Sequence, residues 1–236
     1  MTTKSVVAEL QALGTAQNRQ VYARHGVGTK LYGVSYANLG KLRKKIGLDH
    51  ALALALWKSG SHDARVLATM IADPAQVSSA TLDQWIRNLD NYVITDAFSG
   101  LASRTPHAPT KMRKWMRSRN EWTATAGWNL VAHSALGDAS VDEAFFAGCL
   151  ETIELGIHKA GNRVRYAMNN ALIAIGLRSA TLERRAIAAA KRIGGVEVDH
   201  GETGCKTPDA VPYIQKAKAR RRARRPAGSP RARRRS

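Results

Sequence analysis

Cysteine is scarce in this chain, with two residues among 236, and Cys149 and Cys205 lie far apart in the sequence. Neither belongs to a CxxC pair, and no charged and apolar leader of the kind that directs export follows Met1. We therefore expect two reduced thiols and a cytoplasmic, nucleoid-associated location. No run of about 18 or more consecutive apolar residues occurs, so we expect no membrane partner.

Several catalytic signatures are also missing. The chain has no GxxxxGK[ST] loop, no GxGxxG opening a helix after a strand, no HExxH and no GxSxG. Their absence argues against nucleotide hydrolysis, redox chemistry and serine-type catalysis. The residues Asp199, His200, Glu202 and Cys205 offer possible metal ligands, but their spacing, DHxExxC, fits no zinc arrangement. The favoured interpretation of this segment is a structural turn. We expect the protein to bind no metal ion, no nucleotide cofactor and no other cofactor.

Acidic residues are few, since 18 Asp and Glu stand against 37 Lys and Arg and give a formal charge of +19. Eleven of the basic residues and no acid lie from Lys216 onward, which leaves 26 basic and 18 acidic residues in the rest of the chain. Because the body is basic as well as the tail, the expected partner is a polyanion, with nucleic acid as the leading candidate. Binding of this kind weakens steeply with salt.

Strand signals are scarce, and almost every segment has helical periodicity. Roughly a dozen helices with short connections predict an all-α solenoid of stacked antiparallel helix pairs. No strict sequence repeat is present, so a globular bundle is the alternative. We predict a solenoid domain over 1–193, an irregular closing segment over 194–215 and a disordered polybasic tail over 216–236. The expected helices cover 5–13, 15–25, 36–46, 51–58, 63–72, a stretch around Trp85, 90–103, 110–118, 120–133, 141–157, 161–175 and 181–193.

The stretch 90–103, DNYVITDAFSGLAS, displays a lone acid on a helix. One of its stripes is apolar, and the other places Tyr92, Asp96, Ser99 and Ser103 at i, i+4, i+7 and i+11. The carboxylate of Asp96 thus lies one turn from an aromatic ring in a strongly basic chain. Most surface acids only solvate a helix, so Asp96 is a candidate functional residue that needs support from the rest of the sequence.

The helix expected over 161–175 has a comparable polar stripe, formed by Arg163, Tyr166 and Asn170, with Arg165 nearby. Two such stripes can line one concave surface, as they do in helical-repeat proteins that bind extended ligands. Two ordinary solvated faces are the alternative.

Two basic clusters and one tryptophan complete the candidate contacts. The run KMRKWMRSR holds five cations around a tryptophan, which is typical of a phosphate-gripping helix and equally of a basic solvated helix. The segment 120–133 is apolar nearly all round, so its Trp122 is a candidate contact for which core packing is the favoured interpretation. The cations of the two clusters are Lys111, Arg113, Lys114, Arg117 and Arg119, and Lys41, Arg43 and Lys44.

Three segments together resemble the AlkD-type DNA alkylation repair proteins, which are HEAT-like-repeat DNA glycosylases: YGVSYANLGKLRKKIG, SHDARVLATMI and NYVITDAF. The resemblance covers about residues 20–192. Its most specific part fixes an aromatic residue four positions before an acid. By this resemblance, Asp96 takes the catalytic aspartate position, and Tyr92 and Asn170 take the positions of two tryptophans. Thr123–Thr125 stand where the family has an arginine pair.

The resemblance implies an all-α, HEAT-like solenoid that binds double-stranded DNA, and we expect it to act as a monomer. It also implies a glycosylase that excises cationic N3- or N7-alkylated purines without flipping the base, with Asp96 stabilising the developing oxocarbenium charge. The alternative is a noncatalytic protein that binds duplex or structured DNA through a basic concave groove. A third hypothesis is a protein-interaction solenoid with an incidental basic tail.

Overall fold

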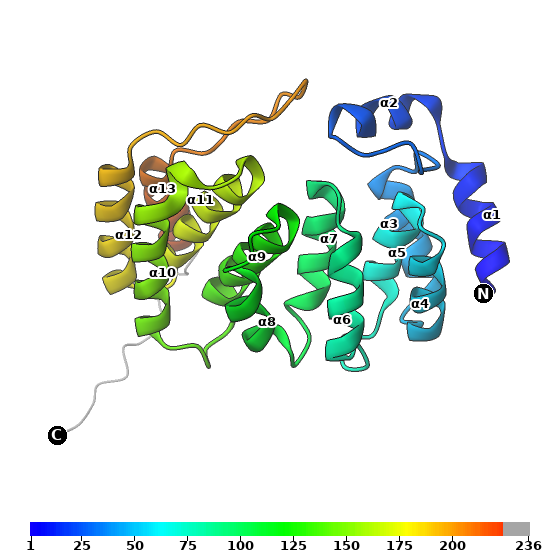
Figure 1. The fold of residues 1–236 in the computed structure, drawn as a ribbon, viewed down its shortest axis with the longest axis horizontal. Helices are drawn as coiled ribbons and strands as arrows, with labels where there is room; N and C mark the ends of the chain where they lie inside the picture. The colour runs from blue at the N-terminus through cyan, green and yellow to red at the C-terminus, as the bar shows by residue number, and fades with distance from the viewer. Residues whose placement is uncertain (224–236) are drawn as a thin grey trace.

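The computed structural model describes residues 1–223, which form an array of helices without a strand among them. Figure 1 shows the helices standing side by side, broadly in chain order, along the long axis of the molecule. Every helix predicted from the sequence is present, and within these residues no helix has the length and apolar character needed to cross a bilayer. The helices are α1 (Thr3–Leu13), α2 (Ala16–Arg24), α3 (Tyr36–Ile46), α4 (His50–Lys58), α5 (His62–Ile71), α6 (Ser79–Trp85), α7 (Tyr92–Ala102), α8 (Ala108–Trp115), α9 (Glu121–Gly137), α10 (Glu143–Gly156), α11 (Asn162–Gly176), α12 (Ala180–Ile193) and α13 (Ala210–Ala223), with short 3-10 turns η1 (Ile86–Asn88) and η2 (Ile157–Lys159).

Side-chain caps fix where several helices begin. Asn91 accepts a hydrogen bond of 3.1 Å from the backbone N–H of Ile94 at the start of α7. Asn120 accepts one of 3.0 Å from Thr123 at the start of α9, and Ser35 caps α3 in the same way. These short polar side chains satisfy backbone donors that the first turn of a helix leaves unpaired.

The helices form two rows. The first row contains α3, α5, α7, α9 and α11, each of which packs against the next. The second row contains α4, α6, α8, α10 and α12. In it the Trp57 ring stacks on Trp85 at 4.0 Å and joins α4 to α6, while an ion pair between Lys111 and Asp83 joins α8 to α6. Rows of helix pairs that contact mainly their neighbours are the architecture of helical-repeat proteins.

A continuous core lies between the two rows. Phe98 of α7 packs between Trp57 and Trp115, with ring centroids 6.3 and 5.6 Å away, and all three side chains are almost completely buried. Aromatic side chains bury large apolar areas and dominate the energetics of such a core. Gly127 of α9 allows the close approach of α8, because a Cβ there would lie 2.1 Å from the backbone nitrogen of Met116.

A buried carboxylate holds the glycine-rich loop between α2 and α3. Asp63 of α5 is completely buried and accepts hydrogen bonds from the backbone N–H groups of Tyr32, Gly33 and Val34. Three donors compensate the loss of water around the charge. This loop therefore has a fixed path, and it fixes α2 relative to the first row.

The end of the described chain corrects the predicted domain boundaries. The sequence predicted an irregular segment over 194–215 followed by a disordered tail, but residues 210–223 form the helix α13. Alanine, lysine and arginine have high helix propensity, so this composition is compatible with a helix once it has something to pack against. Residues 224–236 of the predicted tail lie outside the described part of the chain.

Tertiary contacts anchor α13 to the last repeat. Ile214 is completely buried, and its side chain fills the space beside Gly176 of α11, where an added Cβ would lie 2.7 Å from it. Lys218 pairs with Glu183 of α12 at 2.7 Å. One apolar residue and one ion pair thus decide the structure of a segment that composition alone assigns to a tail.

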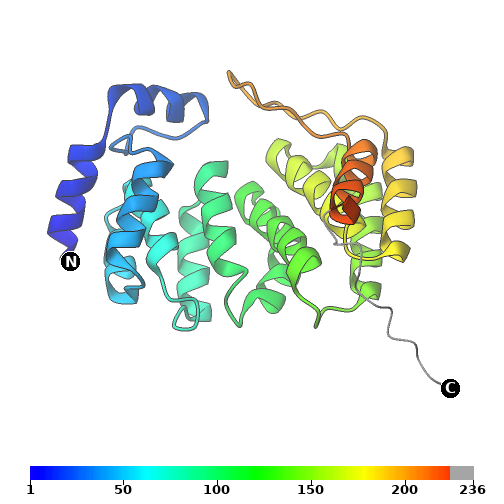
Figure 2. The ribbon, with the colours of Figure 1, turned by 180° about the vertical axis from the view of Figure 1, so that it is seen from behind.

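Residues 194–209 are the part of the predicted closing segment that precedes α13, and they have no regular secondary structure. The term closing segment refers to these residues from here on. Figures 1 and 2 show this segment extending from the end of α12 toward α2. At its tip, Gly201 has a φ of +62°, and a Cβ at this position would lie 3.6 Å from the backbone carbonyl oxygen of Arg24. Asn162 of α11 holds the segment through two hydrogen bonds to the backbone of Asp199, of 2.7 and 2.8 Å. The first and last parts of the array therefore meet on one side of the molecule.

Candidate nucleic-acid interface

Asp96 lies on the exposed side of α7, one helical turn after Tyr92. On the buried side of the helix, the hydroxyl groups of Thr95 and Ser99 donate to backbone carbonyls of the preceding turn. The Asp96 carboxylate accepts a hydrogen bond of 2.8 Å from the Asn129 amide of α9 and forms no ion pair with the residues that the structure describes. The acid is therefore displayed at the junction of α7 and α9.

The surroundings of Asp96 raise the pKa of its carboxyl group. The main cause is desolvation, because protein atoms surround the group closely even though it stays accessible to solvent, as at a concave surface. The hydrogen bond from Asn129 and the positive charge of Arg163 act in the opposite direction. A carboxyl group with a raised pKa exchanges its proton closer to neutral pH, which is useful at a reactive site and also makes the local charge sensitive to pH.

Tyr92 connects three elements that are distant in the sequence. Its hydroxyl group is hydrogen-bonded to Nδ1 of His25 at the end of α2, and the Arg163 guanidinium of α11 lies 3.6 Å from the centroid of its ring. Arg163 is also fixed through its backbone N–H, which donates to the Glu121 carboxylate of α9 at 2.9 Å. A cation on an aromatic face is a favourable contact, and here it covers part of the Tyr92 ring.

The closing segment approaches the same place from the other side. The Tyr166 ring of α11 meets the His200 ring edge-on at 5.3 Å, and His200 is hydrogen-bonded to Thr207 at 3.0 Å. Arg165 was predicted to contact DNA, but its guanidinium donates to the backbone carbonyls of Glu197 and Ala160. The structure corrects that prediction, because Arg165 secures the closing segment to α11.

A second group of cations lies near the end of α7 in the first row. Arg43 follows Tyr36 by seven residues on α3 and so shares its side of the helix. The charge of Arg43 acts on Arg104 at the end of α7, and the charge of Arg104 acts on His133 of α9. Desolvation, followed by these neighbouring charges, lowers the pKa of both Arg104 and His133. None of the three side chains forms an ion pair within residues 1–223.

We use the term inner face for the surface of the first row that carries these side chains. Tyr92 and Asp96 of α7 share a side of their helix, as do Asn129 and His133 of α9. The inner face has an aromatic and acidic end near α2 and a purely basic end near the end of α7. Its members are Tyr36, Arg43, Tyr92, Asp96, Arg104, Asn129, His133, Arg163 and Tyr166.

The basic helix α8 does not belong to the inner face. Lys111, which the sequence predicted as a phosphate contact, is buried and pairs with Asp83 at 2.7 Å. Arg113 lies over the Phe145 ring of α10, 4.2 Å from its centroid, so α8 stands between α6 and α10 in the second row. These contacts correct the prediction that Lys111 and Arg113 contact DNA phosphates. The remaining cations of this cluster, Lys114, Arg117 and Arg119, are exposed and are not brought together with Asp96.

The other predicted contacts have mixed positions. Lys41 and Lys44 are exposed on α3 beside Arg43. Trp122 is half-buried at the start of α9 and packs against the core, which agrees with the favoured interpretation. Asn170 is half-buried on α11 two turns after Arg163, and no contact joins its side chain to Asp96 in the described structure.

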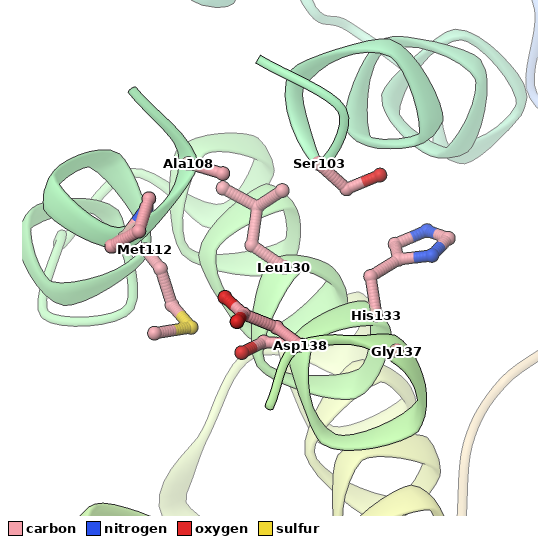
Figure 3. A pocket seen from close by; sticks show the side chains of 9 residues that line it. Ser103, Ala108, Met112, Leu130, His133, Gly137 and Asp138 are labelled. Atoms are coloured by element: carbon pink, nitrogen blue, oxygen red, sulfur yellow. The ribbon is translucent and has the colours of Figure 1, made fainter. Parts of the chain in front are cut away.

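A separate cavity of about 330 Å³ lies between the end of α7, α8 and the end of α9. It is lined by Ser103, His133 and Asp138, the residue types of a hydrolytic triad. Figure 3 shows the Asp138 carboxylate turned away from the His133 ring. The Ser103 hydroxyl donates to a backbone carbonyl, and Asp138 accepts hydrogen bonds from Ser140, so the relay that such a triad requires is not formed.

The sequence analysis did not identify four members of the inner face, which are Tyr36, Asn129, Arg104 and His133. It also did not identify His25 of α2, which is hydrogen-bonded to Tyr92. Asn129 carried a usable signal, because an amide in a helix that is otherwise apolar needs a partner. Arg104 and His133 carried none, because each is an isolated polar residue whose neighbours come from other helices.

Two rows of paired helices with a polar and basic inner face define a helical-repeat protein of the HEAT-like class. The sequence profile of a family described as DNA alkylation repair enzyme matches residues 6–214. The chain belongs to this family, as the resemblance predicted.

Similar proteins extend over nearly the whole chain. The uncharacterized protein Lin0241 of Listeria innocua serovar 6a is 30% identical over 226 residues, which cover 93% of this chain and 99% of that protein. Lmo0209 of Listeria monocytogenes serovar 1/2a is 28% identical over 226 residues with the same two coverages. A solved structure described as "A new family of proteins related to the HEAT-like repeat DNA glycosylases with affinity for branched DNA structures" has a TM-score of 0.85 at 30% identity and covers 94% of this chain and 96% of its own. The HEAT-like repeat fold is thereby confirmed.

Proposed function

We propose that this protein binds DNA on its inner face and prefers branched DNA to a fully paired duplex. The observation that supports this proposal is that Arg43 and Arg104 lie near each other at the basic end of the inner face and Arg163 lies on the same face beside Tyr92, while none of the three forms an ion pair within the described residues. Cations that a protein leaves unpaired and close together are suited to phosphate groups, which release counterions when they bind. The proposal refines the sequence prediction of double-stranded DNA as the partner.

The preference for branched DNA is supported by two further points. The related solved structure comes from proteins described as having affinity for branched DNA structures. In addition, α2 and the closing segment meet at one end of the inner face, so the face is bounded there rather than running on as an open groove. A long straight duplex fits an open groove better than a bounded one.

The proposal is tested by measuring the binding of the full-length protein to a three-way DNA junction and to a duplex of the same length. Fluorescence anisotropy at several salt concentrations gives both affinities. We expect tighter binding to the junction, and a loss of about a hundredfold in affinity between roughly 50 and 200 mM salt. Equal affinity for the two DNAs would remove the branch preference, and salt-insensitive or absent binding would remove the function.

Base excision is the second candidate function, and the display of Asp96 favours it. The carboxylate is accessible, carries a raised pKa and is oriented by Asn129, so it is suitably placed to stabilise positive charge on a sugar. The Tyr92 ring, however, is partly covered by Arg163, and Asn170 supplies no ring where the family resemblance has a tryptophan. We therefore rank excision of N3- or N7-alkylated purines below DNA binding.

The two candidates separate in one assay. Methylated duplex DNA is incubated with the wild-type protein and with Asp96→Asn, and released purines are measured by chromatography. A glycosylase releases 3-methyladenine or 7-methylguanine and loses this release in Asp96→Asn while it still binds DNA. A noncatalytic DNA-binding protein releases neither base. The third hypothesis, a protein-interaction solenoid, predicts that no inner-face substitution changes DNA affinity.

A further inference from the structure

A pocket lined by aromatic side chains opens beside the acidic end of the inner face. Its volume is about 310 Å³, at the lower end of the roughly 300–1,000 Å³ that is usual for small-molecule sites. It lies between α2, α3 and α7. We call it the aromatic pocket, and its main lining residues are Asn18, Val21, Tyr22, His25, Tyr36 and Tyr92.

The walls of the aromatic pocket are fixed before any ligand enters. Tyr22 is buried and its hydroxyl group donates to the carbonyl of Val34 at 2.8 Å. His25 and Tyr92 hold each other through their hydrogen bond, with their rings edge-on at 5.7 Å. Since these walls are already ordered, a ligand does not have to immobilise them, which lowers the entropic penalty of binding.

Tyr36 is the accessible wall of the pocket. Its side chain is 46% exposed although it is a large aromatic residue, and it lies at the start of α3, close enough to Asp96 and Tyr92 for their charges to act on it. Desolvation is the main cause of the raised pKa of the Tyr36 phenol, followed by the charges of Tyr22, Asp96 and Tyr92, so the hydroxyl group is protonated and able to donate a hydrogen bond. An exposed aromatic ring beside a basic face is the usual arrangement for stacking on a base.

The polar groups at the pocket match the edge of a nucleobase. The Asn18 amide offers both a donor and an acceptor, and it forms no side-chain hydrogen bond within the described residues. The Arg163 guanidinium, which lies on the Tyr92 ring, stands next to the pocket and can contact the phosphate of the same nucleotide. Ring faces, an amide and an adjacent cation thus correspond to the three parts of an unpaired nucleotide, which are its planar base, its polar base edge and its phosphate.

We propose that the aromatic pocket holds one unpaired nucleobase of a bound branched DNA, stacked on Tyr36 and bounded by the edge of the Tyr92 ring. The inference rests on the proposed function, because it assigns to the inner face a specific site for a base that a branch point leaves unstacked. A fully paired duplex offers no such base unless one is flipped out, which requires unpairing and unstacking. The pocket therefore supplies a physical reason for a preference for branched over fully paired DNA.

The test compares the full-length wild type with Tyr36→Ala, Tyr36→Phe and a matched control, Tyr213→Ala, which removes a similarly exposed tyrosine from α13. The probes are a three-way junction with 2-aminopurine at an unpaired branch position and a fully paired duplex. We expect Tyr36→Ala to weaken junction binding by about tenfold and duplex binding by less than about twofold. Tyr213→Ala should bind both DNAs as the wild type does, whereas Tyr36→Phe keeps the ring and should lose only the contribution of the hydroxyl group.

The 2-aminopurine emission provides a second measurement, which can be made on the wild type alone. Stacking in the pocket should quench the emission when the wild type binds, and Tyr36→Ala should lose that quenching. If the wild type binds the junction without changing the emission, or if Tyr36→Ala weakens junction and duplex equally, the pocket assignment is overturned while DNA binding stands. If the wild type binds neither DNA, the proposed function itself fails, and the inference fails with it.

Discussion

The two rows of the array differ in the surroundings of their cations. In the second row, several cations are matched within the protein, among them Lys111 with Asp83, Arg185 with Glu151 and Arg192 with Glu154, whereas the exposed cations of α8 and the turn after it form no ion pair within residues 1–223. On the inner face of the first row, the charge of Arg43 acts on Arg104, neither side chain forms an ion pair within residues 1–223, and Arg163 lies on an aromatic ring. The density of basic residues therefore does not identify the binding surface. What distinguishes the inner face is that unpaired cations from different helices share it with aromatic rings, and unpaired cations keep their full attraction for an external phosphate.

Charge reversal on the inner face should have the largest effect. We expect the double variant Arg43→Glu/Arg104→Glu to weaken binding to a three-way junction by about a hundredfold and to reduce the salt slope by about two, because two phosphate contacts are lost and two repulsive charges are added. Fluorescence anisotropy measures both quantities. The matched control is Lys114→Glu/Arg117→Glu, which makes the same change of charge on exposed α8 positions of the second row. A similar loss in both double variants would contradict the comparison between the rows.

A substitution of Lys111 tests how much an ion pair of the second row contributes to the stability of the protein. Replacing Lys111 by Met leaves Asp83 without its partner, and we expect the free energy of unfolding to fall by about 2 kcal/mol, less than for a fully buried pair because Asp83 is partly exposed. Urea denaturation measures this change. DNA affinity should stay within about twofold of the wild type. Adding Asp83→Asn should restore part of the stability, since it removes the unpaired charge. A large loss of DNA affinity with unchanged stability would assign Lys111 to DNA instead.

The basic end of the inner face should make DNA binding sensitive to pH. The pKa of His133 is lowered by desolvation and by Arg104, so the imidazole is neutral near pH 7 and gains its charge only as the pH falls below its usual value. A bound phosphate favours the charged form. We expect junction affinity to rise by about fivefold between roughly pH 7.5 and 5.5. Protonation of Asp96, whose pKa is raised, acts in the same direction by removing a negative charge.

Two variants divide this pH effect between its sources. His133→Asn should keep only the part that comes from Asp96, and Asp96→Asn only the part that comes from His133. A pH profile that neither variant changes would exclude both groups as its cause.

Removal of the lone acid should have the smallest effect on binding. At pH 7.5 we expect Asp96→Asn to tighten binding to the junction by about threefold, because one repulsive charge leaves a basic surface while the hydrogen bond to Asn129 is kept. The control is Asp138→Asn, which removes an acid that is not a member of the inner face and that accepts a hydrogen bond from Ser140. Weaker binding by Asp96→Asn would indicate that the carboxylate contacts the DNA through a donor.

Local sequence patterns predicted the helices well because their apolar periodicity and caps lie within each segment. The helix α3, for example, begins at Tyr36 after its cap and ends at Ile46, as predicted. The same reasoning failed for α13, because its fold depends on Ile214 reaching a space that glycine leaves open on α11. A contact between segments far apart in the chain leaves no trace in local composition.

The residues of the candidate site also divide into those that local sequence patterns predict and those that depend on contacts between helices. Asp96 and Tyr92 were found because helical spacing places them on one exposed stripe. The orientation of α8 was missed, although Lys111 lies four residues before the buried Trp115 and so shares its stripe. Arg104 and His133 lie beyond sequence reasoning, because what makes them notable is their proximity to each other and to Arg43 across three helices.

The approach of Gly201 to the Arg24 carbonyl bears on how the whole array deforms. In a curved stack of helices whose two ends are not in contact, small rotations between neighbouring helices add up to a large change of curvature. In this protein the tip of the closing segment lies beside the end of α2, so a decrease in curvature has to separate these two segments. One distance, from the tip of the closing segment to the end of α2, therefore reports on the curvature of all the helices between them.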